Sequence, residues 1–503
     1  MKVRRVLVAN RGEIALRIVR ACHEEGLEAV AVYSDPDSSS PHVRAADAAV
    51  RIGPGPAAQS YLSIEAILAA ARATRCQAIH PGYGFLSERA VFAEAVEAAG
   101  LGFIGPPSAA IRAMGDKTQA RRRMQAAGVP VVPGGMAPLE DPREAGRLAE
   151  QLGYPVLVKA SAGGGGKGMR LVHRSADLPG ALESAASEAL KAFGDAAVYL
   201  EKYLVRPRHV EIQILADEWK TIHLGERECS IQRRHQKLLE ESPSLAVSPQ
   251  LRREMGQAAV AAANAVHYRG AGTCEFLLDA SGRFYFLEMN TRIQVEHPVT
   301  ELVYAVDLVR EQLRIVRGLG MGVSEWPLAP RGHAIECRIT SEDPANGFLP
   351  STGTIEHLQV PAGPGVRWDG GIETGNQVGL YYDSLLAKLI VHGEDRPSAI
   401  RRMLRALDEL VVVGVGTNQA FLHRLLGDPE FARGEIDIQF LERRADLLTP
   451  AVDPVRDARI AIAAALAEAE RRSGQKPLVA SDGGDREGTD EWGRAGRIDA
   501  LRD

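Results

Sequence analysis

The segment from Glu275 to Glu296 constrains the fold of this chain more than any other. It reads EFLLDASGRFYFLEMNTRIQVE, and two apolar-alternating stretches in it flank the turn-prone pair Ser281-Gly282. This pattern predicts a β-hairpin with a two-residue loop. In that register Ala280 lies opposite Arg283, and Glu275 lies opposite Glu288.

The two facing carboxylates of this hairpin predict a metal site. Like charges directly opposite each other destabilise a sheet. Oxygen ligands suit Mg²⁺ or Mn²⁺, so a divalent cation between Glu275 and Glu288 would remove the repulsion. Beyond the second strand, polar residues keep a period of two, and an extended chain would place them on one side. These residues are Glu288, Asn290, Arg292, Gln294 and Glu296, with Met289, Ile293 and Val295 on the other side. A solvated strand face would explain any one of them, but it does not explain the whole set.

Length, charge and cysteine content limit the class of protein. The chain has 503 residues, which is enough for about three domains. Its net charge of -5 gives no electrostatic basis for binding nucleic acid or an anionic membrane. No apolar run approaches the roughly 18 residues that span a bilayer, and the N-terminus has no signal-peptide core. The five cysteines are scattered without a CxxC pattern, so we expect reduced thiols in a cytoplasmic protein.

Residues 1–115 alternate strand and helix patterns. We expect strands at VRRVLVAN, LEAVAVYS, CQAIHPGYG and LGFIG, and helices at GEIALRIVRACHEEG and SIEAILAAARAT. This alternation predicts a parallel, doubly wound sheet. Such sheets host many chemistries, so this part alone does not indicate a function.

The remainder divides into three parts. Residues 116–330 begin with a helix and contain a smaller α+β unit at about 131–203, followed by a larger sheet region. Residues 331–445 are rich in β patterns and then helical from Ser398 to Leu410. Residues 446–503 form a tail that we expect to be a helix followed by a disordered, polar and glycine-rich stretch.

The glycine run from Gly163 to Gly166 lies between two expected strands. A dinucleotide fingerprint would need a helix after the run, and Ser161 and Gly168 do not fit a Walker A loop. What remains is a glycine hairpin, whose backbone N–H groups can lie over phosphates. Lys159, on the strand before the run, is the natural phosphate-binding cation.

Three further segments are rich in donors. EKYLVRPRHVEIQ (201–213) could present backbone groups to an adenine edge, and its His209 either contacts a ribose or phosphate or packs in the core. CSIQRRHQK (229–237) mixes amide, imidazole, guanidinium and ammonium groups, which favours an anion pocket. HAIECRIT (333–340) alternates so that Glu336 and Arg338 share one face of a strand.

Taken together and in order, these motifs resemble biotin carboxylase, the ATP-grasp component of biotin-dependent carboxylases. The matching segments are VANRGEIALRI, HPGYGFLSE, MGDK at 114–117, KASAGGGGKGM, EKYL, RHVEIQ, CSIQRRHQK, EMNTRIQVEHPVTE and HAIECRI. The resemblance covers residues 1–445. It implies a Rossmann-like N-terminal domain, an ATP-grasp domain with a mobile lid at 131–203, and a mixed C-terminal domain, an α/β and α+β architecture.

The resemblance also implies a reaction. ATP phosphorylates bicarbonate to carboxyphosphate, CO₂ is released at the site, and biotin N1′ is carboxylated. Glu296 is then the base, Arg338 stabilises the enolate oxygen of biotin, and Arg292 and Lys237 complete the catalytic set. Arginine suits this role because its planar fork pairs bidentately with a planar oxyanion.

Ligand positions follow from the same matched motifs. ATP would contact Lys117, Lys159, Gly163, Gly164, Gly165, Gly166, Glu201, Lys202, Tyr203, Leu204, His209, Gln232 and His235. Two Mg²⁺ or Mn²⁺ ions would bind Glu275, Glu288 and Asn290. Bicarbonate would bind Lys237, Arg292, Gln294, the backbone of Val295, and Arg338, which also binds biotin.

The expected partners are other polypeptides. Long members of the family carry their biotin on a lysine within Met-Lys-Met, whereas Met-Lys occurs here only at Met1-Lys2. We therefore expect a separate biotin carboxyl carrier protein, separate carboxyltransferase subunits and a homodimer of this chain, with no nucleic acid or membrane partner. The first-choice assignment is the biotin carboxylase component of acetyl-CoA carboxylase, which supplies malonyl-CoA for fatty acid synthesis.

Three alternatives are open. The chain could serve a pyruvate or propionyl-CoA carboxylase, because the first half-reaction is the same. It could be another ATP-grasp ligase that joins a carboxylate to an amine, although a pocket of Lys237, Arg292, Gln294 and Arg338 is too small for a bulky acid. It could also be a nucleotide-binding regulator, although the intact acidic and basic residues argue against loss of catalysis.

Overall fold

The computed structural model describes most of the chain in two separate units. The first unit spans residues 1–449 and the second spans 450–503. The described residues are 2–135, 139, 141–160, 169–193, 195–234, 236–323, 326–449 and ten positions between 454 and 469. Those ten positions are helical. The glycine run, His235 and the expected disordered stretch lie outside the described residues.

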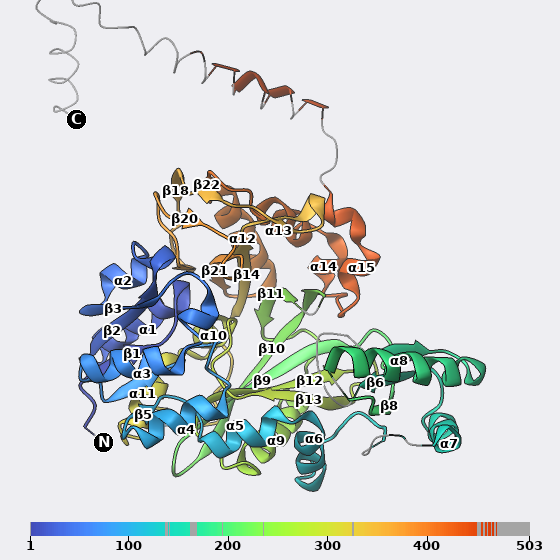
Figure 1. The fold of residues 1–503 in the computed structure, drawn as a ribbon. Coiled ribbons are helices and arrows are strands. Elements are labelled where there is room, and N and C mark those ends of the chain that lie inside the picture. Colours follow the sequence, from blue (N-terminus) through green and yellow to red (C-terminus); the bar gives the residue numbers. More distant parts are fainter. Residues whose placement is uncertain are drawn as a thin grey trace, which may run out of the picture. The chain divides into compact units, whose positions relative to one another are not determined.

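The first unit begins with a five-stranded parallel sheet in the order β3-β2-β1-β4-β5 (Figure 1). Alternate residues of β1 face different cores: Val6 and Val8 pack with α1, whereas Leu7 packs with α3 and α4. Helices therefore cover both faces, and the predicted doubly wound sheet is confirmed. The elements are β1 (Arg5–Val8), α1 (Gly12–Glu24), β2 (Glu28–Ser34), α2 (Pro41–Ala45), β3 (Ala48–Gly53), α3 (Ile64–Ala73), β4 (Ala78–His80), α4 (Ala90–Ala98), β5 (Gly102–Phe103) and α5 (Ser108–Gly115).

A small α+β unit follows helix α6 (Lys117–Ala126). Its sheet has the order β7-β6-β8 and is antiparallel. Val156, Val158 and Leu200 of this sheet pack with Ala145 and Ala149 in a core separate from the others. The elements are α7 (Pro142–Leu152), β6 (Val156–Ala160), β7 (Arg170–Val172), α8 (Leu178–Phe193) and β8 (Val198–Lys202).

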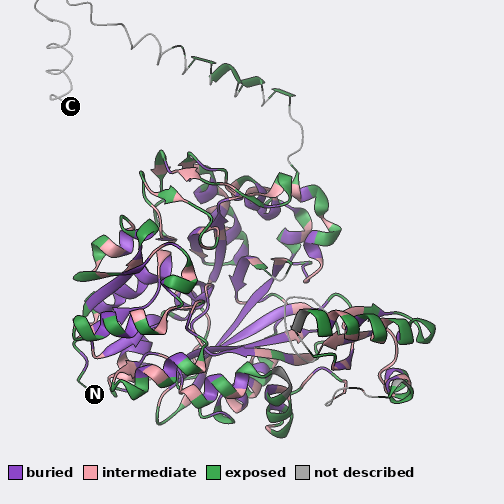
Figure 2. Ribbon diagram, viewed as in Figure 1, coloured by how far each residue is buried: buried purple, intermediate pink, exposed green. Residues whose placement is uncertain are grey.

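An eight-stranded antiparallel sheet forms the centre of the unit, in the order β13-β12-β9-β10-β11-β14-β21-β19. Its central strands are largely buried (Figure 2). The pairing of β11 with β14 joins the region before residue 330 to the region after it, so side chains far apart in sequence share one surface. The strands are β9 (Arg208–Ala216), β10 (Thr221–Arg233), β11 (Gln236–Ser242), β12 (Gly270–Leu278), β13 (Phe284–Asn290), β14 (His333–Thr340), β19 (Val366–Gly370) and β21 (Leu385–Gly393).

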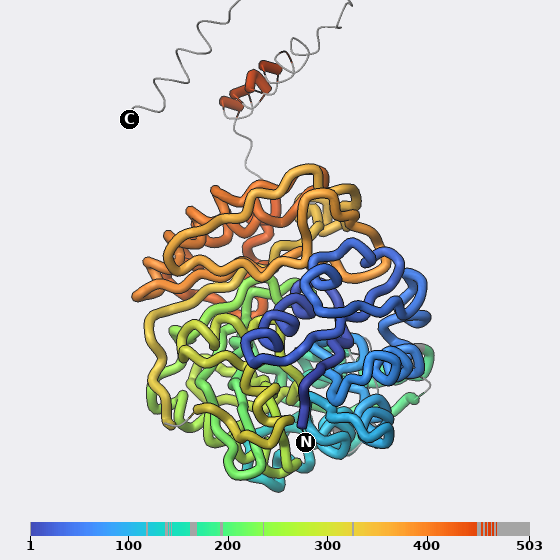
Figure 3. The backbone as a smooth tube through the Cα atoms, turned by 90° about the vertical axis from the view of Figure 1, so that its left-hand side faces the viewer, coloured from blue at the N-terminus to red at the C-terminus, as the bar shows by residue number. Residues whose placement is uncertain are grey.

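Helices and short strands cover this sheet. The N-terminal helix α1 contacts β19 and β21, so the first and last thirds of the unit lie side by side (Figure 3). Met403, Phe421 and Phe440 belong to a core at the C-terminal end. The remaining elements include α9 (Pro249–Asn264), α10 (His297–Tyr304), α11 (Leu308–Val316), α12 (Arg396–Glu409), α13 (Gln419–Leu426), α14 (Pro429–Arg433), α15 (Phe440–Arg443) and the two-stranded pairs β15 (Glu342–Asp343) with β16 (Leu349–Pro350), β17 (Gly353–Thr354) with β20 (Gln377–Val378), and β18 (His357–Gln359) with β22 (Val411–Val413). Among the described residues, no helix has the length and apolar composition needed to cross a membrane.

The β12–β13 hairpin differs from the prediction at its turn. Its loop runs over residues 279–283, so the predicted two-residue loop and the opposition of Ala280 and Arg283 are wrong. The reason is Asp279, whose carboxylate accepts the backbone N–H groups of Ser281 at 2.8 Å and Arg283 at 3.0 Å and stabilises a wider turn. A register shift between the pairs Phe276–Phe286 and Glu275–Glu288 then restores the predicted opposition of the two glutamates.

Candidate active site

Three glutamates and an arginine form a row across four strands of the large sheet. Glu288 of β13 pairs with Glu275 of β12, Glu275 pairs with Glu211 of β9, and Glu211 pairs with Arg227 of β10. Directly opposite residues face the same side of a sheet, so the carboxylates repel one another unless cations neutralise them. Glu211 and Arg227 were not predicted. For Glu211 a signal existed, because it alternates with His209 in RHVEIQ.

Lys237 of β11 neutralises this row. Its ammonium lies 2.6 Å from Glu211, 2.9 Å from Glu275 and 2.6 Å from Glu296. Burial alone would lower the pKa of Lys237, but these three carboxylates raise it well above its usual value. Lys237 therefore stays protonated at the centre of the site.

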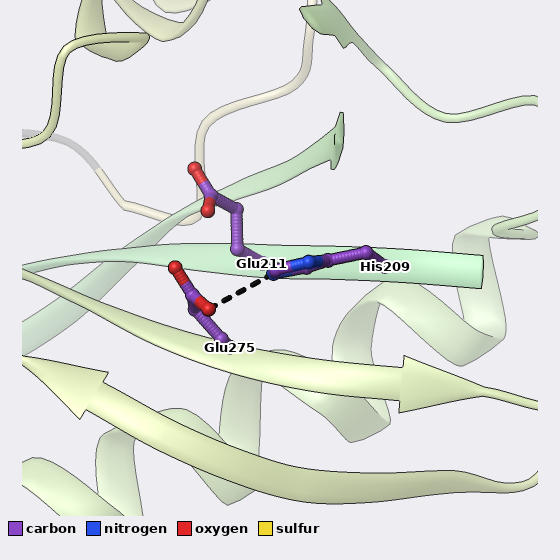
Figure 4. Close-up of side chains that lie close together, drawn as sticks. All are labelled: His209, Glu211 and Glu275. Carbon is purple, nitrogen blue, oxygen red and sulfur yellow. Dashed lines mark ion pairs between the residues drawn. The ribbon is translucent and has the colours of Figure 1, made fainter. Parts of the chain in front are cut away.

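His209 is the second basic residue beside the row. Its ring lies 3.0 Å from Glu275, and the side chains of His209, Glu211 and Glu275 lie close together on the neighbouring strands β9 and β12 (Figure 4). Burial lowers the pKa of His209, yet Glu275 more than offsets this and raises it. Burial likewise raises the pKa of Glu275, whereas Lys237 and His209 bring it well below its usual value. Of the two alternatives left open for His209, the structure thus gives a buried residue that is also part of the site.

Arg227 fixes the position of Glu211. It is fully buried and donates to the Glu211 carboxylate, to Gln213 at 2.6 Å, to Thr300 at 2.9 Å and to Thr273 at 3.0 Å. A buried guanidinium needs this many acceptors to offset its desolvation. The network holds one face of the row rigid.

The predicted polar residues after β13 do converge, but not along an extended strand. The strand ends at Asn290, because Glu88 from the N-terminal region accepts hydrogen bonds from the Thr291 backbone at 3.0 Å and the Arg292 guanidinium at 2.8 Å. The predicted extended continuation is therefore wrong. Arg292 still donates to Gln294 at 3.1 Å and to Asn290 at 3.3 Å.

The amide side chains turn back to the carboxylate row. Asn290 donates to Glu275 at 2.8 Å, and Gln294 donates to the same oxygen at 3.1 Å. Asn290, Arg292 and Gln294 thus form one connected set with Glu275. The period of two thus identified residues that do meet, although the backbone after Asn290 is bent and not extended.

Glu296 and Arg338 close the pocket from the C-terminal side. Glu296 precedes α10, is fully buried, and pairs with Lys237 at 2.6 Å and Arg338 at 3.0 Å. Burial would raise the pKa of Glu296, but Lys237, Arg338 and Arg227 hold it well below its usual value. Arg338 also donates through Nε to Glu240 of β11 at 2.6 Å, a contact that the sequence did not predict.

Lys388 supports the backbone beside Glu296. Its ammonium is fully buried and donates to the Val295 carbonyl at 3.0 Å while pairing with Glu13 of α1 at 3.1 Å. Sequence reasoning missed Lys388, because the stretch LAKLIV reads as an ordinary buried strand.

The structure brings only some of the predicted ATP-binding residues into contact with one another. Lys159 lies 2.7 Å from Glu201, so the structure brings these two together. Lys202 instead donates to the Gly153 carbonyl at 2.7 Å, and the Tyr203 hydroxyl accepts from Gln439 at 2.9 Å. Leu204 is half-buried, and Gln232 pairs with Lys237 across β10 and β11. Lys117 begins α6, and Gly163–Gly166 and His235 lie outside the described residues.

Comparisons with known proteins agree along the length of the first unit. Residues 2–111 match the family "Biotin carboxylase, N-terminal domain", residues 116–323 match "Carbamoyl-phosphate synthase L chain, ATP binding domain", and residues 336–443 match "Biotin carboxylase C-terminal domain". The biotin carboxylase of Nostoc sp. is 54% identical over 443 residues, which are 88% of this chain and 99% of the relative. One of the pyruvate carboxylase subunits of Methanothermobacter thermautotrophicus is 51% identical and covers 87% of this chain and 89% of that protein.

A solved structure of a biotin carboxylase domain also matches this chain. The biotin carboxylase domain dimer of Hydrogenobacter thermophilus 2-oxoglutarate carboxylase, in complex with MgADP, ADP and bicarbonate, superposes with a TM-score of 0.83 at 46% identity. The match covers 90% of this chain and 100% of that domain. The chain therefore belongs to the biotin carboxylase family, the ATP-grasp enzymes that carboxylate biotin with ATP and bicarbonate.

Proposed function

We propose that this chain is the biotin carboxylase component of an acetyl-CoA carboxylase and acts on biotin held by a separate carrier protein. One observation carries the assignment of the reaction centre: Lys237 and Arg338, which come from two different strands, both reach Glu296. Beside Glu275, Arg292 and Gln294 complete a small set of donors. A pocket of this kind suits a small planar oxyanion.

Bicarbonate is the substrate that these donors fit. Lys237, Arg292, Gln294, Arg338 and the backbone of Val295 would hold it, so the two cations would exchange one carboxylate partner for another. As Lys237 and Arg338 turn from Glu296 to bicarbonate, the carboxylate of Glu296 loses the charges that depress its pKa. It can then take the proton of bicarbonate, and the carbonate oxygen attacks the γ-phosphorus of ATP to give carboxyphosphate and ADP.

Arg338 has a second task after CO₂ is released from carboxyphosphate. Attack on CO₂ by biotin N1′ requires charge to develop on the ureido oxygen of biotin, and a fixed guanidinium stabilises such charge without reorganisation. Burial would lower the pKa of Arg338, but Glu240 and Glu296 raise it above its usual value, so Arg338 remains a cation.

The divalent cations would bind at the edge of the carboxylate row. Glu275 and Glu288 face each other, and Asn290 adds an amide oxygen, which is the donor chemistry that Mg²⁺ or Mn²⁺ accepts. When bound there, the ions would neutralise phosphate charge during phosphoryl transfer. The direct opposition of Glu275 and Glu288 supports this assignment, since a cation between the two carboxylates removes their repulsion.

The small α+β unit at residues 131–203 would act as the lid over ATP within an ATP-grasp domain of residues 116–330. Its separate core supports motion as one body. It also carries the Lys159–Glu201 ion pair, in which the triphosphate of ATP would compete with Glu201 for the Lys159 ammonium. The other ATP contacts are proposed at Lys117, Gly163–Gly166, Lys202, Tyr203, Leu204, His209, Gln232 and His235. Residues 331–445 would form the C-terminal domain.

The partners follow from the same assignment. We expect a biotin carboxyl carrier protein, carboxyltransferase subunits, a homodimer of this chain, and a place in the cytoplasm. The alternative whole complex is a pyruvate or propionyl-CoA carboxylase, because a component of a pyruvate carboxylase is 51% identical to this chain. Affinity purification of the tagged chain from its own cells decides between them: recovery of an acetyl-CoA carboxyltransferase supports the first choice, and recovery of a pyruvate-specific one refutes it.

The reaction itself is tested with the purified chain, ATP, Mg²⁺, bicarbonate and free biotin. ADP release should depend on bicarbonate and increase with biotin, and carboxybiotin should form. An avidin blot should detect no biotin on the chain. A folded sample without biotin-stimulated ADP release would contradict the proposed function, and a positive blot would contradict the separate carrier.

A further inference from the structure

Two buried glutamates lie behind Arg338, and the proposed reaction does not use them. Glu240 of β11 and Glu336 of β14 are directly opposite each other in the sheet, so they face the same side. Both are fully buried. Glu240 uses its Oε1 atom to accept from Arg338 at 2.6 Å.

Three of their four carboxyl oxygens have no hydrogen-bond donor among the described residues. Oε2 of Glu240 and both oxygens of Glu336 accept no hydrogen bond from any residue that the structure describes. Two neighbours of Glu336 on its face of the sheet are apolar, Ala334 along β14 and Ile390 across on β21. A buried carboxylate in such surroundings is costly unless it is paired or protonated.

Within the described parts of the chain, no cation is left to pair with Glu336. The charged groups that act on it are Lys388 from β21, Arg338 from its own strand, Glu240 from β11 and Glu296 from the start of α10. Lys388 is engaged with Glu13 and the Val295 carbonyl, and Arg338 is engaged with Glu240 and Glu296. Burial raises the pKa of Glu336 well above its usual value, and Glu240 raises it further, although Lys388 opposes the rise. A buried carboxyl group with no donor and no unengaged cation beside it favours its neutral, protonated form.

A neutral carboxylic acid has one O–H to donate, and the acceptor opposite is Oε2 of Glu240. We propose that Glu336 is a positioning residue for Arg338: it donates this hydrogen bond to Glu240 and so keeps Oε1 of Glu240 on the guanidinium. This inference rests on the proposed role of Arg338 in stabilising the biotin enolate.

The same contact controls the charge of Glu240. Burial and the nearby Glu296 raise the pKa of Glu240 to about 7, although Arg338 and Lys237 oppose the rise. A hydrogen bond donated to the charged form of a carboxyl group favours that form. Glu336 therefore helps Glu240 to ionise and to anchor Arg338. Without this donor, Glu240 would keep its own proton to a higher pH and would release Arg338.

Two substitutions of similar volume test the proposal. Glu336→Gln keeps a donor toward Glu240, whereas Glu336→Met keeps only the volume. The rate of biotin carboxylation should rise with pH through an acid limb near pH 7 in the wild type and in Glu336→Gln. In Glu336→Met the limb should move to higher pH, the rate at pH 7 should fall roughly tenfold, and more ATP should be hydrolysed for each biotin carboxylated.

A spectroscopic readout separates this inference from the proposed function. Infrared spectra of the unliganded protein at a pH above the acid limb of Glu240 should contain a neutral carboxyl band that is lost in Glu336→Gln. In Glu336→Met, protonated Glu240 should contribute a band of its own until the pH passes the shifted limb. Glu228→Gln is the control, because it removes another buried carboxyl whose partners are Arg208, Ser230 and Ser244. It should leave that band and the pH profile in place. If the wild type did not carboxylate biotin, the proposed function would fail, and the infrared comparison would still decide the state of Glu336.

The proposal is overturned if the band survives in Glu336→Gln, or if Glu336→Met keeps the wild-type pH profile and the wild-type ratio of ATP hydrolysed to biotin carboxylated. Thermal unfolding shows whether each variant is folded. If Glu336→Met does not fold, the infrared comparison of the wild type with Glu336→Gln still gives the answer.

Discussion

Replacing Glu296 with glutamine isolates the charge of the proposed base from its shape. Glutamine keeps the length of the side chain and one oxygen acceptor, but it cannot take a proton from bicarbonate. The surrounding cations remain paired, because Lys237 keeps Glu211 and Glu275 and Arg338 keeps Glu240. We therefore expect the fold to persist and the chemistry to fail.

The two effects differ in size. A positioned general base contributes about 10²–10⁴-fold to a rate, which corresponds to roughly 3–5 kcal/mol of the activation free energy. Loss of the charged hydrogen bonds should lower the free energy of unfolding by about 2 kcal/mol. Nucleotide affinity should stay close to that of the wild type. Among the residues that the structure describes, none that is proposed to bind ATP contacts Glu296.

Glu301→Gln is a matched control on the adjacent helix α10. Glu301 is also buried and pairs with two arginines, Arg17 at 3.0 Å and Arg367 at 2.7 Å. Each arginine keeps another carboxylate, Asp307 or Asp369. This variant should lose a similar amount of stability and keep the wild-type rate.

The assay pairs denaturant unfolding with steady-state measurement of carboxybiotin and ADP, and adds ATP binding by calorimetry. The assignment of Glu296 as the base is wrong if Glu296→Gln carboxylates biotin at the wild-type rate. It is also wrong if the variant fails only because ATP no longer binds. Equal loss of rate in Glu301→Gln would show that destabilisation, not the missing base, explains the result.

Other parts of the structure give three more predictions. Glu288→Gln should remove one repulsive charge and stay folded, yet need more Mg²⁺ and turn over more slowly; normal metal dependence would exclude Glu288 as a ligand. Burial raises the pKa of Glu241, but Arg396 at 2.6 Å and His333 at 2.8 Å hold it at about 2, so its stabilisation is present above pH ~4.3 and is lost as the pH falls toward 2. In acid titrations Glu241→Gln should therefore lack about 3 kcal/mol of the pH-dependent unfolding free energy, and a curve parallel to the wild type would refute this. Hydrogen exchange at residues 163–168 should slow when ATP is added, and equal exchange with and without ATP would count against the lid.

Sequence periodicity predicted the secondary structure correctly where local residue pattern alone determines the fold. The parallel sheet of residues 1–115 follows from strands and crossover helices in alternation. The opposition of Glu275 and Glu288 was also correct, although the turn was not. Asp279 widened the loop by binding backbone N–H groups, and a register shift in the hairpin cancelled the change. Two local deviations thus offset each other, and sequence reasoning could not have anticipated either one.

Other site residues were beyond local reasoning because their roles depend on contacts between distant segments. Lys388 lies in an apolar strand, and its role becomes visible only from its contacts with Glu13 and the Val295 carbonyl. Glu88 ends a strand more than two hundred residues away by holding Thr291 and Arg292. A burial pattern read from one segment indicates that a charge is enclosed, but it does not identify the partner.

The pairing of β11 with β14 would let one pocket hold both of the proposed substrates, bicarbonate and biotin. Lys237 and Glu240 lie on β11, whereas Glu336 and Arg338 lie on β14, and the register places Glu240 opposite Glu336. The proposed bicarbonate donor Lys237 and the proposed biotin donor Arg338 are therefore held by adjacent strands of a single sheet, so motion of the small α+β unit need not disturb their spacing. If that sheet is the rigid part of the enzyme, ATP should slow hydrogen exchange in residues 131–203 and leave the protection of β11 and β14 unchanged. A change of protection in β11 and β14 upon ATP binding would show instead that the pocket itself is assembled by the nucleotide.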